Sequence, residues 1–233
     1  MNKKWFWYLG FFVVLLGIFY LVIFSTIDFS SSKLPVINNN IQSFSFIDQD
    51  GKKITEKDVE GKVYVAEYFF TTCKGICPKM NANMRRVFNE FENEKDFMIL
   101  SHTCMPETDS VPLMKAYEIK MLNGRLEKIG NEVYKIEYDS SMGTAKQSTF
   151  WHFVTGEKSA LYKMARQSYL IDNNKKDSAA AIADQFIHTQ FFALIDKQTR
   201  LRGVYDGLKE DEMQKLIKDI KALLKESYQS RSL

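Results

Sequence analysis

The N-terminal part of the chain carries one long apolar run, residues 5–24, with no charged residue and no proline. Twenty residues in an α-helix rise by about 30 Å, which matches the hydrocarbon thickness of a bilayer. Lys3 and Lys4 precede the run, and the positive-inside rule keeps such an end in the cytoplasm. The run is longer than the core of a cleaved signal peptide, and residues 25–28 form a poor cleavage site. We therefore expect an uncleaved transmembrane anchor at 5–24, behind a cytoplasmic N-terminus at 1–4.

Beyond a polar segment at 25–40, which predicts a linker, apolar strand-like runs alternate with stretches of helical spacing. The strand-like runs lie at 63–70, 96–102, 149–154, 191–195 and 201–205, and a final amphipathic helix lies at 209–226. Alternating strands and helices predict a largely parallel sheet with helices on both faces, and the last two runs add an antiparallel hairpin. This is the layout of a thioredoxin-like α/β fold, a central mixed sheet flanked by helices. We place this domain at 41–229.

Two cysteines stand where the first of these runs passes into a helix. Cys73 and Cys77 are four residues apart, and Pro78 follows in what would be the first helical turn. Residues at this spacing on a helix are rotated by only about 40°, so both sulfurs can point the same way. The strand end is where α/β folds bind ligands, and a helix N-terminus favours the thiolate form. The spacing predicts either a disulfide or two thiolate ligands of one metal ion. A purely structural disulfide, or two unrelated buried thiols, would not need this junction.

Composition narrows the class of function. The formal net charge is +3, and no basic stripe with interleaved aromatic residues is present, so we expect no nucleic-acid partner. Three cysteines are too few for a disulfide scaffold. In an exported domain, two neighbouring cysteines indicate redox or metal chemistry.

Four other residues are weaker candidates. Cys104 follows the second strand at the same sheet edge and can serve as an auxiliary ligand or a resolving thiol, although a lone cysteine is more often a small buried apolar residue. His102 and His152 lie within strands, which favours structural roles. Asp109 or Ser110 is expected to cap the next helix, so a cap is favoured over a ligand role for Asp109. The segment 123–147 carries mixed charge and no clear period.

Three motifs, taken together, resemble the Sco/SenC family over residues 41–226. They are Phe-Thr-Thr-Cys-Lys-Gly-Ile-Cys-Pro at 70–78, Trp-His-Phe-Val-Thr-Gly at 151–156, and His-Thr at 188–189 before the strand at 192–195. The resemblance implies a membrane-anchored copper metallochaperone that binds one copper ion, as Cu(I) or Cu(II), through Cys73, Cys77 and His188. It implies a role in assembling the binuclear copper centre of cytochrome c oxidase. The copper-centre subunit of the oxidase would be its partner, with a copper donor or a thiol reductant upstream.

The ligand set agrees with the chemistry of its donors. Two thiolates and an imidazole are soft to borderline ligands, which suit Cu(I) and tolerate Cu(II). Ordinary thioredoxins carry a cis-proline where this chain has His188, and no proline lies near that histidine. The chain departs from the family pattern at Lys74, where proline is frequent, at Ile187, where aspartate is frequent, and in the length of 123–147. The alternative for His188, which the match around it disfavours, is a surface or hydrogen-bonded histidine at the end of a strand.

A metallochaperone is not an enzyme, and the main alternative hypothesis is a thiol–disulfide oxidoreductase that reduces the cysteines of a partner. That activity needs the two thiols but not His188. A redox or copper sensor is a further alternative. A peroxidase is disfavoured, because a threonine is expected three residues before the attacking cysteine, where Phe70 stands. We expect a single-pass protein of the cell inner membrane, with its main domain in the periplasm or extracytoplasmic space.

Overall fold

The structure is a computed structural model, and it describes residues 3–26, 34–131, 133–144, 146, 148, 150–172 and 189–228. The chain forms two compact units, Met1–Leu34 and Pro35–Leu233. Each is described by itself.

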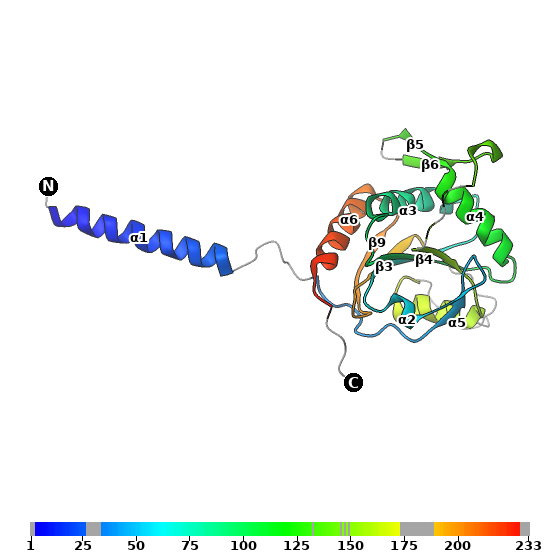
Figure 1. Ribbon diagram of the computed structural model, residues 1–233, viewed down its shortest axis with the longest axis horizontal. Coiled ribbons are helices and arrows are strands. Elements are labelled where there is room, and N and C mark those ends of the chain that lie inside the picture. Colours follow the sequence, from blue (N-terminus) through cyan, green and yellow to red (C-terminus); the bar gives the residue numbers. More distant parts are fainter. Residues whose placement is uncertain are drawn as a thin grey trace. The chain divides into compact units, whose positions relative to one another are not determined.

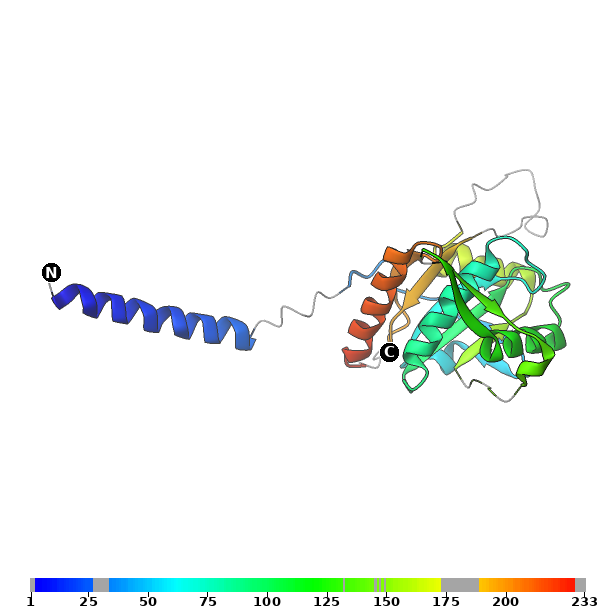
Figure 2. The same ribbon diagram turned by 90° about the horizontal axis from the view of Figure 1, so that it is seen from above.

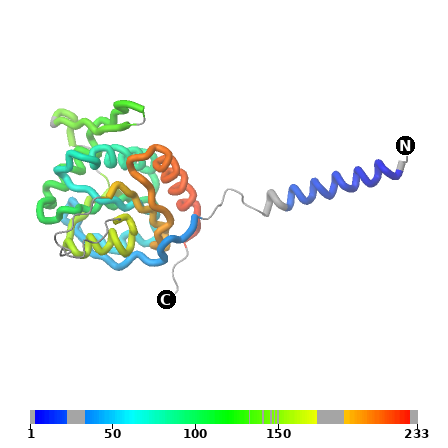
Figure 3. Tube along the Cα trace, turned by 180° about the vertical axis from the view of Figure 1, so that it is seen from behind, coloured from blue at the N-terminus to red at the C-terminus, as the bar shows by residue number. Residues whose placement is uncertain are grey.

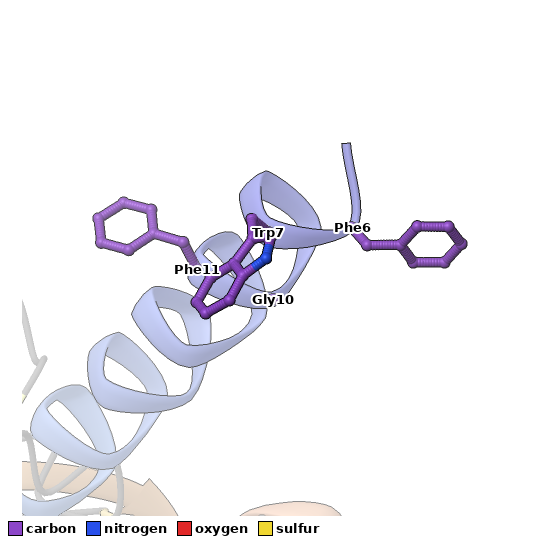
Figure 4. A pocket seen from close by; sticks show the side chains of 4 residues that line it. All are labelled: Phe6, Trp7, Gly10 and Phe11. Carbon is purple, nitrogen blue, oxygen red and sulfur yellow. The ribbon is translucent and has the colours of Figure 1, made fainter. Parts of the chain in front are cut away.

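Among its described residues, the first unit contains an apolar helix, α1 (Lys3–Thr26). Its stretch Lys4–Val22 is long and apolar enough to cross a membrane. The large apolar side chains in that stretch are exposed, as Trp7 is at 83%. Figure 4 shows Phe6, Trp7 and Phe11 spreading from the helix around Gly10, where the helix surface is hollowed. Because a single helix forms this hollow, the hollow does not enclose a ligand. The exposed apolar side chains suit an apolar surrounding such as lipid.

The second unit is built on a five-stranded sheet in the order β7-β4-β3-β8-β9. The strands are β3 (Val63–Phe69), β4 (Phe97–Thr103), β7 (Trp151–Val154), β8 (Phe191–Ile195) and β9 (Leu201–Asp206). β3 runs parallel to β4, and β4 runs parallel to β7, whereas β8 is antiparallel to both β3 and β9. Every residue of β3 and β4 is buried, as expected of central strands covered on both faces. The predicted mixed sheet is confirmed.

Helices cover both faces of this sheet. They are α2 (Glu56–Val59), α3 (Cys77–Phe91), α4 (Val111–Asn123), α5 (Lys158–Lys163), which continues into a π-turn at Met164–Ser168, and α6 (Glu210–Lys225). Figure 1 shows α3, α4 and α6 on one side of the sheet and α2 and α5 on the other. The apolar stripe predicted for the last helix is buried at Met213, Leu216, Ile220 and Leu223.

Two short hairpins complete the unit. β1 (Ser45–Ile47) pairs with β2 (Lys53–Thr55), and Gly51 in the turn between them takes a left-handed φ of 74°. β5 (Arg125–Gly130) pairs with β6 (Val133–Glu137) inside the segment whose sequence showed no clear period. A short 3-10 turn, Ser140–Met142, follows it. This second hairpin lies against α3 and projects from the domain in Figures 1 and 3, whereas in the view from above it lies across the domain (Figure 2).

The carboxyl ends of β3 and β4 lie side by side. Their register pairs Phe69 with Thr103, the last residues of the two strands. The loop that leaves β3 carries Cys73, and the residue that follows β4 is Cys104. Parallel pairing therefore brings the three cysteines to one edge of the sheet.

Candidate metal centre

The two cysteines of the motif lie on either side of a loop–helix boundary. β3 ends at Phe69, and Cys77 is the first residue of α3. The backbone oxygen of Ile76 accepts from the amides of Lys79 and Met80 at 3.1 and 3.0 Å, which starts the helix at the predicted place. Cys73 precedes the helix in a turn, where its amide donates to Phe70 O at 3.2 Å.

The two thiols face each other and are not joined. Cys73 is half-buried and Cys77 is buried, at 5% exposure, and both are free thiols. Burial raises the pKa of the Cys77 thiol, and a hydrogen bond with the Cys73 side chain raises this pKa further. The sequence predicted the opposite direction, because a helix N-terminus favours thiolate. That prediction is wrong for Cys77, since loss of hydration in the buried position outweighs the partial charge of the helix.

A cavity of about 370 Å³ opens beside this pair. Its lining includes Phe70, Cys73, Ile76, Cys77, Cys104 and Thr189. Thr189 is buried and donates from Oγ1 to Ile171 O at 2.6 Å, so its position is fixed at the start of the segment that enters β8. The predicted third ligand, His188, is the residue immediately before Thr189 in the sequence and lies outside the described residues. Ile187 lies outside them too.

Two sulfurs that face one cavity suit a soft cation, because thiolates are the ligands that Cu(I) prefers. Within the described part of the chain, no group of three or more histidine, cysteine, aspartate or glutamate side chains is close enough to hold a metal ion. Among the described residues, the candidate ligands at this cavity are Cys73 and Cys77. The residues present fit a soft metal as a pair that needs a third donor.

Cys104 lines the same cavity but has different hydrogen-bond partners. It is buried, its amide donates to Phe69 O at 2.9 Å, and its Sγ donates to the same oxygen at 3.2 Å. Burial raises the pKa of this thiol to about 12, and the nearby Asp109 carboxylate acts in the same direction. The protonated form is therefore strongly favoured at neutral pH.

The two described histidines do not line this cavity. His102 is fully buried, its ring stacks on Tyr68 with centroids 5.0 Å apart, and burial lowers its pKa to about 4. His152 Nδ1 lies 3.3 Å from Asp48 Oδ2. His102 is therefore a neutral histidine in the core, and His152 lies beside the carboxylate of Asp48.

Of the two residues expected to cap α4, Ser110 occupies the N-cap position, without a side-chain capping bond. The expectation that Asp109 caps the helix is wrong, because its carboxylate is used elsewhere. The carboxylate accepts from the hydroxyls of Thr71 and Thr103, each at 2.5 Å. No local sequence signal distinguishes this use of an aspartate from a cap, because both partners lie outside its own turn.

The fold and the facing thiols define a class of protein: a thioredoxin-like domain with an oxidisable dithiol site at the edge of its sheet, carried by a chain with an apolar N-terminal helix. The SCO1/SenC family model matches residues 36–136 and 137–225. The chain belongs to the SCO1/SenC family.

Comparisons with individual proteins agree with the family assignment. The chain is 26% identical over 188 residues to the SCO1 protein homolog of Bacillus subtilis, covering 80% of this chain and 83% of that protein. BsSco, described as having a disulfide switch and as a member of the Sco family of cytochrome c oxidase assembly proteins, is similar with a TM-score of 0.60 and 24% identity, over 82% of this chain and 96% of its own. Arabidopsis thaliana ScoI, solved with copper bound, has a TM-score of 0.53 and 21% identity, over 78% of this chain and 98% of its own. The last two comparisons show the shared fold.

Proposed function

We propose that this protein is a membrane-anchored copper metallochaperone that holds one copper ion through Cys73, Cys77 and His188. The observation that carries the proposal is the pair of facing thiols in a cavity that is also lined by Thr189, the residue after His188. Family membership supports it, and so does the copper bound in the plant ScoI structure of the same fold. The client we propose is the copper-centre subunit of cytochrome c oxidase, because BsSco is described as belonging to a family of oxidase assembly proteins.

In the proposed function, the main task of the protein is to hold the copper ligands in position. When copper binds, the two thiols give up their protons, and the positive charge of the metal offsets the penalty that burial places on the Cys77 thiolate. Cys73 is only partly buried, so this ligand stays accessible to the thiols of a partner and the cargo can pass by ligand exchange. Oxidation of the pair to a disulfide removes two protons and two electrons and blocks binding, which makes the site a redox switch.

A copper titration of the full-length reduced protein in detergent tests the proposal. We expect one equivalent of Cu(I) to bind, with thiolate-to-copper charge transfer on oxidation to the Cu(II) form. His188→Ala should weaken binding, and Cys73→Ala or Cys77→Ala should abolish it. Tight binding by the double Cys→Ala variant would contradict the assignment. Binding that is indifferent to His188, with retained reduction of a partner disulfide, would favour a thiol–disulfide oxidoreductase.

We propose further that the chain is divided into a cytoplasmic end at 1–4, a single membrane span at 5–24, a linker at 25–40 and a copper-binding domain at 41–229. The apolar helix supports the anchor, and the lysines before it support an orientation that places the domain outside the inner membrane. Labelling of Cys73 from outside the cell tests this orientation.

A further inference from the structure

The buried carboxylate of Asp109 links the loop that carries Cys73 to the segment that follows β4. Asp109 is 1% exposed. Thr71 donates from Oγ1 to Asp109 Oδ1 at 2.5 Å, and the Thr71 amide lies 3.3 Å from each carboxylate oxygen. The other oxygen, Oδ2, accepts from Thr103 Oγ1 at 2.5 Å. Thr103 Oγ1 in turn accepts from the amide of Met105 at 2.9 Å.

These bonds connect two neighbouring strand ends. Thr103 closes β4, and Thr71 follows β3 by two residues, so the carboxylate bridges the segments that leave the sheet side by side. A buried carboxylate is costly unless it is hydrogen-bonded, and here donors from both segments satisfy it. The donors of Thr71 are therefore part of what compensates the burial of this carboxylate.

The two cysteines differ in what fixes them. Cys77 belongs to the first turn of α3 and is buried. Cys73 is half-buried, lies outside regular structure, and is two residues from Thr71. Its position therefore depends on how firmly the start of the loop is held.

We propose that Asp109 is a positioning residue that acts through Thr71 to hold the Cys73 thiol against Cys77. The copper part of this inference rests on the proposed function, and the redox part does not. A loop that is already ordered loses less conformational entropy when its two sulfurs join or chelate, so the effective concentration of one thiol at the other is higher. The hydrogen bonds between Asp109 and Thr71 thus favour both disulfide formation and copper binding.

The test is a redox equilibrium of the full-length protein in detergent with glutathione. Cys73 and Cys77 lose two protons and two electrons as their disulfide forms, and glutathione disulfide takes them up to give two glutathione thiols. Thr71→Val keeps the shape of the side chain and removes the hydroxyl donor. We expect the equilibrium constant for the disulfide to fall about tenfold, which is about 30 mV for this two-electron couple. Cu(I) affinity, measured against a competing chelator, should fall by about the same factor.

Two matched variants separate positioning from loss of stability. Thr71→Ser keeps the hydroxyl and should retain the wild-type equilibrium constant. Tyr205→Phe removes another buried hydroxyl-to-carboxylate bond, from Tyr205 to Asp219 at 2.7 Å, at a residue that does not line the cavity, and should leave the redox equilibrium unchanged. If circular dichroism shows that Thr71→Val does not fold, Asp109→Asn keeps the shape with one acceptor oxygen fewer and should give a smaller shift in the same direction.

The proposal is overturned if Thr71→Val matches the wild type, or if Tyr205→Phe shifts the equilibrium equally. Failure of the proposed function looks different. A wild-type protein that binds no copper would contradict the metallochaperone assignment, while the glutathione equilibrium would still decide whether Asp109 positions the thiols.

Discussion

Glu67 is a carboxylic acid buried completely within β3. Ser101 Oγ donates to Glu67 Oε1 at 2.6 Å and accepts from Trp151 Nε1 at 2.9 Å. Oε2 has no hydrogen-bond partner among the described residues. Burial raises the pKa of Glu67 from 4.5 to about 8, against the opposing effect of the Ser101 hydrogen bond. The folded protein therefore keeps this group mainly protonated at neutral pH.

That proton makes stability depend on pH. Since the folded pKa is raised, the unfolded chain releases the proton above about pH 4.5 while the folded chain keeps it until about pH 8. The contribution of Glu67 to stability is therefore full at low pH and is lost as the pH rises through this window, by up to about 1.4 kcal/mol per pH unit. Glu67→Gln should flatten that slope, which guanidinium unfolding at about pH 5, 7 and 9 measures. Equal slopes in the two proteins would contradict the assignment.

Single residues also show where sequence analysis succeeds. Cys73 and Cys77 could be paired from the sequence, because their spacing and the helix start are local. The roles of Glu67 and Asp109 could not, because each depends on partners brought close by the sheet: Ser101 for the first, Thr71 for the second. A lone acid in an apolar run and an aspartate before a helix have the same local pattern whatever they contact.

Among the elements, α3 carries the site and is held by its neighbours. Arg86 on this helix forms a two-pronged ion pair with Glu210 of α6, with both N···O distances 2.6 Å. Its guanidinium also lies over the ring of Tyr134 in β6, 4.2 Å from the centroid. Both partners of the ion pair are mostly buried, at 13% and 16% side-chain exposure, so solvent screens it less than a surface pair.

Arg86→Ala should therefore destabilise the domain by about 2–3 kcal/mol, because a charge-assisted bond pair and a cation–π contact are lost and Glu210 keeps a partly buried charge. Chemical denaturation measures the loss. Lys135→Ala, at the exposed ion pair with Glu137, is the matched control and should change stability little. If Arg86→Ala lowers the free energy of unfolding no more than this control does, the ion pair does not stabilise the packing of α3.

The sequence predicted the five strands of the main sheet and left the β5–β6 hairpin unresolved. Strands such as β3 and β4 are continuous apolar runs because helices cover both of their faces, and such runs are recognisable. The β5–β6 hairpin is partly or fully exposed along both strands, so its residues show no two-residue alternation. Its packing against α3 is a tertiary contact that no local pattern encodes.

The whole molecule joins two units with opposite solvent requirements. The unit Pro35–Leu233 has its own buried core and contains both matched family segments. The helix α1 exposes large apolar side chains along Lys4–Val22 and is stable in lipid rather than in water. Anchoring therefore follows from the helix, and the side of the membrane on which the thiols lie decides which partners they can reach.

Labelling of intact spheroplasts with a membrane-impermeant maleimide reports that side. If the domain is outside, the reagent should modify the full-length protein without lysis, and mainly at Cys73, because Cys73 is half-buried whereas Cys77 and Cys104 are buried. Cys73→Ser should lose most of the label in intact cells while keeping the same membrane association. Modification that appears only after lysis would place the domain in the cytoplasm and reverse the orientation that the lysines before α1 indicate. In that case the thiols would meet the reducing glutathione pool, and the redox switch would stay in its dithiol form.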